Sequence, residues 1–226
     1  EISRESVSLH DDIDFGATAF DAIRQEVRTL KEAGGMLGYP WPWDILNDAT
    51  PGIEDESLYI FYGRPKSRKT WTLMAITAHL YVKCGARVLV WCREMSPLQL
   101  RRRLACTIGQ VSYGRYTKGL MHEEEEDDLL DALADLEGAE ARGDESRMLI
   151  TRGSQGGDNA SKSFMELQAK ADEFRPTVII MDSAYHMQSS TKWRDIAELT
   201  RGLKNLAVNL KVPVLCTWQA NREGEK

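Results

Sequence analysis

Short runs of nearly continuous apolar residues alternate along the chain with longer segments in which apolar residues recur every three or four positions. The short runs predict strands buried on both faces, and the longer segments predict helices that pack against a sheet. We expect strands at 57–62, 87–92, 147–151, 177–182 and 212–217. We expect helices between them at 70–84, 96–110, 122–141, 159–174 and 192–210. This order predicts an α/β fold with a mostly parallel sheet and helices on both faces.

The segment before the first strand has a different pattern. Residues 1–16 are polar and are expected to be a flexible lead-in. An amphipathic helix is predicted at 18–32, ending before two glycines, because apolar residues fall at helical spacing at Phe20, Ile23, Val27 and Leu30. Its apolar stripe needs a partner, which we expect on a neighbouring subunit rather than on the same domain. Residues 38–51 are expected to form a loop and a short helix over one edge of the sheet.

Composition narrows the classes of protein that remain. Hydrophobic content of 42% and charged content of 28% are ordinary for a soluble domain. No apolar run approaches the roughly 20 residues that span a bilayer, and the start of the chain lacks a signal-peptide core. We therefore expect a cytoplasmic protein with no membrane partner. The four scattered cysteines predict buried free thiols rather than a zinc site.

The net charge of the chain limits the ways in which it could bind nucleic acid. A net charge of −6 argues against a surface that coats nucleic acid indiscriminately, although it allows DNA to bind in a local channel. Much of the acidity lies in the run Glu123–Asp128, which is expected to be the solvated start of a helix, where acids face the positive end of the helix dipole.

The first predicted strand runs directly into a basic turn, and an apolar helix follows. The turn and the helix start consist of Gly63, Arg64, Pro65, Lys66, Ser67, Arg68, Lys69 and Thr70. In a phosphate-binding loop, backbone N–H groups surround the phosphates, a lysine neutralises the outer oxygens and a hydroxyl ligates Mg²⁺. Lys69 and Thr70 suit the last two roles, but Arg68 stands where the pattern G-x-x-x-x-G-K-[ST] has its second glycine. The alternative is a basic strand–helix turn that binds no ligand.

Polar residues also follow three of the later strands. Glu94 comes just after the second strand and before a helix that Ser96 is expected to cap, Asp182 ends the fourth strand and Gln219 follows the fifth. Parallel strands end at one edge of a sheet, so these side chains are expected to form one site with Lys69. Nucleoside triphosphate hydrolysis there would use Glu94 to polarise the attacking water, Asp182 to organise Mg²⁺ and Gln219 to sense the γ-phosphate. Taken singly, each has an ordinary alternative: an acid at a helix start, a strand-end carboxylate and a surface amide.

Four segments carry a family resemblance: GRPKSRKT (63–70), REMSPLQL (93–100), TVIIMDSAYHM (177–187) and VPVLCTWQANRE (212–223). In this order they resemble the motor domain of DnaB-type replicative helicases, within the RecA-like ATPase superfamily, and phage versions most strongly. The resemblance implies a RecA-like P-loop ATPase core over 36–226, preceded by a lead-in and linker helix over 1–35. It implies ATP and Mg²⁺ as cofactors, with Glu94, Lys69 and Gln219 in catalysis and Thr70 and Asp182 on the metal.

The resemblance also implies partners. The expected partners are single-stranded DNA, a primase, a helicase loader and further copies of the chain. The copies are expected to form a hexameric ring in which each linker helix binds the neighbouring subunit. If a phage encodes the protein, its expected location is the host cytoplasm. Lys192, Arg194 and Arg222 are the candidates for DNA phosphate contacts, and the alternative is that they are ordinary surface cations. The triple Arg101–Arg103 is expected at an interface or in solvent. The family's remaining strands and its arginine finger have no counterpart before residue 226, so the motor is expected to be incomplete at its C-terminus.

Two alternatives to a helicase stay open at this point. One is a RecA/KaiC-like ATPase that acts as a recombination mediator or loader without unwinding DNA. The other is a nucleotide-sensing assembly module without catalysis, which Arg68 would favour.

Overall fold

A computed structural model describes residues 16–32, 34–141, 147–153, 160–187 and 193–219. The chain divides into two compact units, Glu1–Leu37 and Gly38–Lys226. In the first unit, helix α1 spans Ala17–Glu32, which confirms the predicted amphipathic helix. It ends where predicted, because Gly34 and Gly35 take positive φ angles of 67° and 84° and the Gly35 N–H donates to the Leu30 carbonyl at 2.7 Å.

The second unit is built on a parallel sheet of five strands in the order β1-β5-β4-β2-β3. The strands are β1 (Leu58–Gly63), β2 (Arg87–Cys92), β3 (Arg147–Arg152), β4 (Val178–Asp182) and β5 (Val214–Gln219). The predicted α/β architecture is confirmed, with small shifts in the strand bounds. For example, β5 begins at Val214 rather than at 212, because Pro213 has no N–H to donate to a neighbouring strand.

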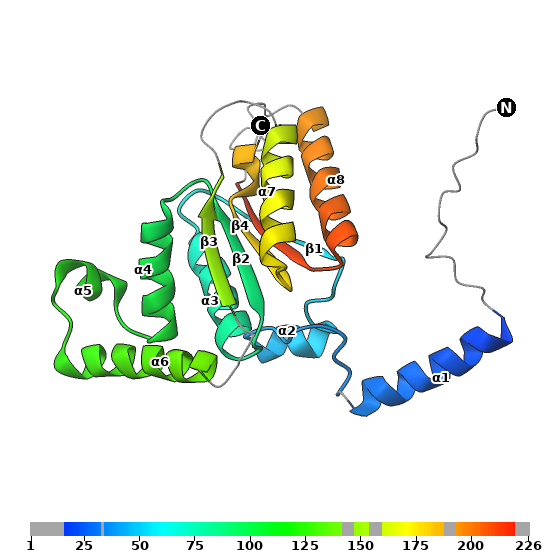
Figure 1. The fold of residues 1–226 in the computed structure, drawn as a ribbon, viewed down its shortest axis with the longest axis horizontal. Coiled ribbons are helices and arrows are strands. Elements are labelled where there is room, and N and C mark those ends of the chain that lie inside the picture. Colours follow the sequence, from blue (N-terminus) through cyan, green and yellow to red (C-terminus); the bar gives the residue numbers. More distant parts are fainter. Residues whose placement is uncertain (1–15, 33, 142–146, 154–159, 188–192, 220–226) are drawn as a thin grey trace. The chain divides into compact units, whose positions relative to one another are not determined.

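Helices cover both faces of this sheet (Figure 1). They are α2 (Asp44–Ala49), α3 (Lys69–Val82), α4 (Pro97–Ile108), α5 (Tyr113–Lys118), α6 (Glu123–Ala141), α7 (Ala160–Phe174), the 3₁₀ helix η1 (Ala184–Met187) and α8 (Trp193–Leu210). The expected segments are confirmed, and α6 begins with the acidic run as predicted. Helix α5 was not predicted, since six residues are too few to show a hydrophobic period; Ser112 caps its start and Gly119, at φ 65°, ends it.

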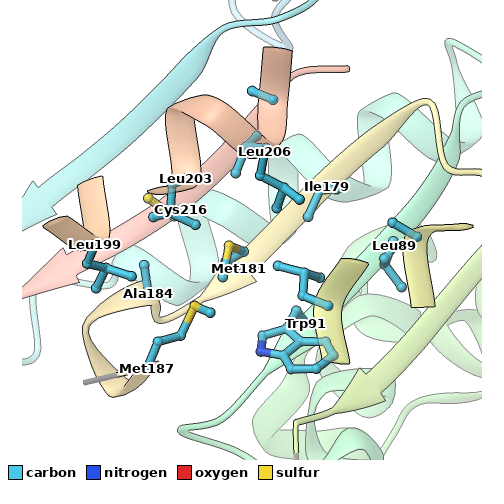
Figure 2. Close-up of a cluster of buried hydrophobic side chains, with 14 of the residues drawn as sticks. Leu89, Trp91, Ile179, Met181, Ala184, Met187, Leu199, Leu203, Leu206 and Cys216 are labelled. Atoms are coloured by element: carbon cyan, nitrogen blue, oxygen red, sulfur yellow. The ribbon is translucent and has the colours of Figure 1, made fainter. Parts of the chain in front are cut away.

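Two apolar clusters lie on opposite faces of the sheet, because successive strand residues point to opposite sides. One cluster joins Leu89, Ile179 and Cys216 to helices α7 and α8 (Figure 2). The other joins strand residues such as Val88 and Ile180 to α3 and α4. Strands buried on both faces explain the nearly continuous apolar runs of the sequence.

The segment before β1 covers one edge of the sheet, as predicted. The Trp41 ring packs edge-on against Tyr59 and Phe61 of β1, with centroid distances of 5.2 and 6.2 Å. Its indole N–H donates to the Thr50 hydroxyl at 3.0 Å, just after helix α2. Since β1 is an edge strand, this packing shields one of its faces from solvent.

The cysteines are free thiols, as the sequence predicts; Cys92, Cys106 and Cys216 are buried and Cys84 is partly buried. Burial raises the pKa of the Cys216 thiol to about 12, so it stays protonated at neutral pH. None of the helices in the described ranges has the length and apolar character needed to cross a membrane.

Candidate nucleotide site

The basic turn between β1 and α3 closes on itself through Lys69. Its ammonium group donates a hydrogen bond of 2.7 Å to the Arg64 carbonyl, at the other end of the turn. Gly63 ends β1 beneath this contact, and a Cβ there would lie 2.7 Å from the Ser67 hydroxyl oxygen and 3.4 Å from Lys69 Cδ. The turn therefore requires glycine at 63 for close approach of side chains, and it holds Lys69 at the N-terminus of α3, where the helix dipole favours anions.

Arg68 takes the backbone conformation that favours glycine. Its φ and ψ are 63° and 22°, in the left-handed region, and Lys66 two residues earlier has φ 65°. A residue with a Cβ pays about 1–2 kcal/mol for this conformation. The turn thus keeps the geometry of a glycine position although an arginine occupies it, and the Arg68 side chain is exposed at the cleft described below.

Glu94 is positioned by the strand end beside it. Cys92, the last residue of β2, pairs with Asp182, the last residue of β4. The N–H groups of Arg93 and Glu94 lie 3.1 and 3.5 Å from the Asp182 carbonyl oxygen. The chain then enters α4 through a capping box, in which the Gln99 N–H donates to the Ser96 hydroxyl at 3.2 Å and the Ser96 N–H donates to Gln99 Oε1 at 3.1 Å. The expected cap at Ser96 is confirmed, and the Glu94 side chain is left exposed between two fixed elements.

Asp182 is a buried carboxylate with one oxygen unpaired. Its side chain is 1% exposed. Oδ1 accepts a hydrogen bond of 2.7 Å from the Thr217 hydroxyl of β5, whereas Oδ2 has no partner among the described residues. A buried, unpartnered carboxylate oxygen is costly in a folded chain. Such an oxygen fits the coordination sphere of a hard cation or of its bound water.

One cleft of about 380 Å³ collects these residues. It is lined by Pro65, Lys66, Ser67, Arg68, Lys69, Thr70, Trp71, Glu94, Arg103, Asp182 and Gln219. Gln219 reaches it because the last residue of β5 pairs in register with Gly63, the last residue of β1. Lys69, Glu94, Asp182 and Gln219 therefore lie around one cavity. Gly63 and Arg64 support the turn but do not line the cleft.

The cleft is locally positive although the chain carries a net charge of −6. Among its lining residues, Lys66, Arg68, Lys69 and Arg103 are cationic, and Glu94 and Asp182 are acidic. An excess of cations in a concave site attracts anions. The lining thus suits a polyphosphate, and the two carboxylates suit its counter-cation.

Sequence reasoning missed the 3₁₀ helix η1, which follows Asp182. The ring centroids of Tyr185 and His186 lie 4.0 Å apart with the rings tilted by 35°, and His186 Nε2 is buried without a hydrogen-bond partner among the described residues. Burial lowers the pKa of His186, while the charge of Glu94 opposes the shift. Burial and then the charge of Glu94 raise the pKa of Tyr185. The sequence signal available for these two residues was their position, because Tyr185 and His186 closely follow the aspartate that ends the fourth strand.

The position of Arg103 corrects the expectation for the arginine triple. Arg101 and Arg102 are exposed, but Arg103 is partly buried and lines the cleft. Its guanidinium lies 5.0 Å from the Trp71 ring centroid and 5.6 Å from that of Tyr113. The reason is the helical period: α4 buries Leu100 and Leu104 against α3, and Arg103, three residues after Leu100, lies on the flank of that buried face, whereas Arg102 lies on the opposite side of the helix.

Of the three residues predicted to contact DNA, the structure describes one. Arg194 is exposed in the first turn of α8. Lys192 and Arg222 lie outside the described residues.

The fold and the cleft define the class: this is a parallel α/β domain with a basic turn and a concave site at one edge of its sheet, and solved structures share the fold. The ATPase domain of G40P aligns with a TM-score of 0.69 at 17% identity, covering 93% of this chain and 74% of that one. A DnaB-like replicative helicase, solved in a study of its interactions with primase, aligns with a TM-score of 0.68 at 18% identity, covering 95% and 50%.

The family is shown by sequence. Residues 38–226 match the family described as the DnaB-like helicase C-terminal domain, and the chain belongs to it. Similar curated proteins include the replicative DNA helicases DnaB of Geobacillus stearothermophilus and DnaC of Bacillus subtilis (strain 168). Each is 25% identical over 202 residues, which cover 85% of this chain and 42% of the relative. The chain thus spans about two fifths of the length of these relatives.

Proposed function

We propose that this chain is the ATP-hydrolysing motor domain of a replicative DNA helicase. The observation that carries the proposal is the convergence of Lys69, Thr70, Glu94, Asp182 and Gln219 on one positively charged cleft. Its volume of about 380 Å³ is within the range of small-molecule sites. Membership of the DnaB-like family supports a helicase over a recombination mediator or a non-catalytic module.

Lys69 and the start of α3 hold the phosphates in this mechanism. The Lys69 ammonium, now bonded to the Arg64 carbonyl at 2.7 Å, is close enough to the turn to transfer a hydrogen bond to a terminal phosphate oxygen. The free N–H groups of the first helical turn add donors on the same side. Arg68 and Lys66 increase the local positive charge without replacing Lys69.

Thr70 and Asp182 would hold Mg²⁺. The fit rests on the unpaired buried Oδ2 of Asp182 and on a hydroxyl at the N-terminus of α3, both oxygen donors of the type this cation prefers. Bound there, the ion would neutralise charge that develops on the phosphate oxygens. Thr217 keeps the Asp182 carboxylate oriented through its hydroxyl.

Glu94 is proposed to accept the proton of the attacking water. Its side chain is exposed at the cleft, whereas its backbone is held at the end of β4 by the Asp182 carbonyl, so the carboxylate reaches solvent from a fixed backbone position. Gln219, from the end of β5, is proposed to sense the terminal phosphate and to transmit its presence to the chain that follows. Arg194, Lys192 and Arg222 are proposed to contact single-stranded DNA, and α1 to bind a neighbouring copy in a hexameric ring. A primase and a loader remain proposed partners.

The test removes the proton acceptor that we propose at Glu94. Glu94→Gln should leave ATP affinity within a few-fold of the unmodified protein and reduce turnover by at least about 100-fold, the lower range for a positioned acid–base group. Glu54→Gln, outside the cleft, is the matched control. DNA-stimulated hydrolysis and unwinding of a forked duplex by the intact protein test the helicase assignment. Unchanged turnover in Glu94→Gln would remove Glu94 from the mechanism, and DNA-stimulated hydrolysis without unwinding would favour a mediator.

A further inference from the structure

A side-chain hydrogen bond joins strands β4 and β5 beyond their last backbone pair. In the described part of the chain, backbone pairing between these strands ends with Met181 and Cys216, although β5 continues to Gln219. At the next position the Thr217 hydroxyl donates to Asp182 Oδ1 at 2.7 Å. We propose that this hydrogen bond couples the Asp182 carboxylate to Gln219, and that Thr217 is a positioning residue for both. This inference rests on the proposed function, and it describes how the cation-binding and phosphate-sensing parts of that site are connected.

The two partners of this hydrogen bond are held by different strands. On one side, the backbone of Asp182 pairs with Cys92 at the end of β2. On the other side, the last residues of β5 pair with β1, where Gln219 lies beside Gly63. The Thr217 hydroxyl therefore bridges a strand end fixed to β2 and a strand end fixed to β1. Because energetic coupling between sites is carried by such hydrogen-bond and packing networks, a change at one strand end can reach the other through this bridge.

Burial and restricted side-chain rotation make the bridge strong and directional. Thr217 and Asp182 are each 1% exposed, so water does not compete for the hydroxyl proton. A β-branched side chain has few allowed χ1 angles, which fixes the direction of its hydroxyl oxygen. Hydrogen bonds to an ionised acceptor are also about twice as strong as neutral ones. Since Oδ1 is occupied by this bond, Oδ2 is the oxygen that remains for a cation or its bound water.

Thr217 and Gln219 lie on the same side of β5, because side chains two residues apart on a strand point to one face. Gln219 and Asp182 both line the nucleotide cleft. When Asp182 is held by a bound cation, Thr217 holds the end of β5 against it, and Gln219 then meets the terminal phosphate from a fixed backbone position. The preference for a nucleoside triphosphate over a diphosphate should therefore increase with Mg²⁺, and part of that increase should require the Thr217 hydroxyl.

The test measures how much Mg²⁺ increases the preference for a triphosphate. Isothermal titration calorimetry with adenylyl imidodiphosphate, a non-hydrolysable ATP analogue, and with ADP gives the ratio of the two affinities in Mg²⁺ and in EDTA. Thr217→Val keeps the shape of the side chain but removes the hydroxyl, and it should reduce the Mg²⁺-dependent gain in this ratio about 10-fold, within the usual range of coupling between sites. Thr217→Ser keeps the hydroxyl and should retain the gain within about two-fold.

Thr77→Val is the matched control, because Thr77 is also fully buried but does not line the cleft. Its hydroxyl donates to the Leu73 carbonyl at 2.7 Å within α3. The control thus loses one buried hydroxyl and one hydrogen bond, as Thr217→Val does, and it should keep the full Mg²⁺-dependent gain.

A double-mutant cycle separates coupling from a purely structural role. If Thr217 acts through Gln219, Thr217→Val should cause no further loss of the gain in a Gln219→Asn background. Additive losses would show that the two residues act independently, and the proposal would be wrong. It would also be wrong if Thr217→Val weakened both nucleotides by the same factor or left the gain unchanged.

Should Thr217→Val fail to fold, Thr217→Cys replaces the hydroxyl with a weaker donor and must lose part of the gain. A full gain in Thr217→Cys would then overturn the proposal. Failure of the proposed function has a different signature, because Lys69→Ala would then change the affinity of neither nucleotide, in Mg²⁺ or in EDTA.

Discussion

Replacing Arg68 with glycine tests whether the basic turn between β1 and α3 stores backbone strain. Arg68 has a φ of 63°, where a side chain costs about 1–2 kcal/mol and glycine costs nothing. Glycine in turn loses about 0.5–1 kcal/mol more conformational freedom on folding. The middle of each range gives a net stabilisation of about 0.7 kcal/mol for Arg68→Gly, which corresponds to a rise of about 2 °C in Tm for a domain of this size.

Thermal unfolding followed by circular dichroism, without nucleotide, measures the change. Ser67→Gly is the matched control, because Ser67 is in the same turn but has no positive φ, so the variant gains flexibility without losing strain. It should melt at or below the temperature of the unmodified chain. Lys66→Gly, with φ 65°, should raise Tm as Arg68→Gly does. If Arg68→Gly melts no higher than Ser67→Gly, the strain argument fails.

The same variant separates the backbone of Arg68 from its charge. Because the turn already has the geometry of a glycine position, we expect Arg68→Gly to change ATP affinity by no more than a few-fold, the contribution of one exposed charge. Arg68→Lys should retain the affinity of the unmodified chain. A large gain in affinity in Arg68→Gly would show instead that the arginine crowds the site.

Three further predictions concern the cleft and its surroundings. Without Mg²⁺, Asp182→Asn should raise the free energy of unfolding by about 1 kcal/mol, and with it Tm, because an unpartnered charged oxygen costs more than an unpartnered amide. The same variant should abolish turnover. An unchanged or lower Tm would contradict the stability argument. Gly63→Ala should reduce turnover by up to about 100-fold by displacing Ser67 and Lys69, and Ser67→Ala in that background should recover part of the loss because it removes the oxygen 2.7 Å from the new Cβ. Hydrogen bonds from Arg115 and from the His122 N–H lower the pKa of Glu125 to about 2, so the stability it contributes is complete above its ordinary pKa of 4.5 and is lost as the pH falls toward 2. The difference in Tm between the unmodified chain and Glu125→Gln should therefore narrow below pH 4.5, and a difference that stays constant down to pH 2 would contradict this.

Local pattern was enough to predict most elements of the fold. Apolar runs and helical spacing are properties of neighbouring residues, so they located the strands, α1, the long helices of the second unit and the cap at Ser96. The basic turn at 63–70 could be located for the same reason, since its residues are consecutive in the chain. Helix α5 was not predicted because it is short and is defined by single residues at its ends, Ser112 and Gly119.

The sequence by itself determined which residues end the strands, and the tertiary structure decided which of those ends meet. Strand order β1-β5-β4-β2-β3 depends on pairing between segments far apart in the chain, and it is this pairing that places Gln219 beside Gly63 and Asp182 beside Cys92. The same holds for the cluster around Arg103, whose sequence neighbours Arg101 and Arg102 have the same chemistry but face solvent. Side-chain type is local, whereas burial and proximity arise only when helices pack on the sheet, and so the position of Arg103 beside Trp71 and Tyr113 had no signature before the fold was known.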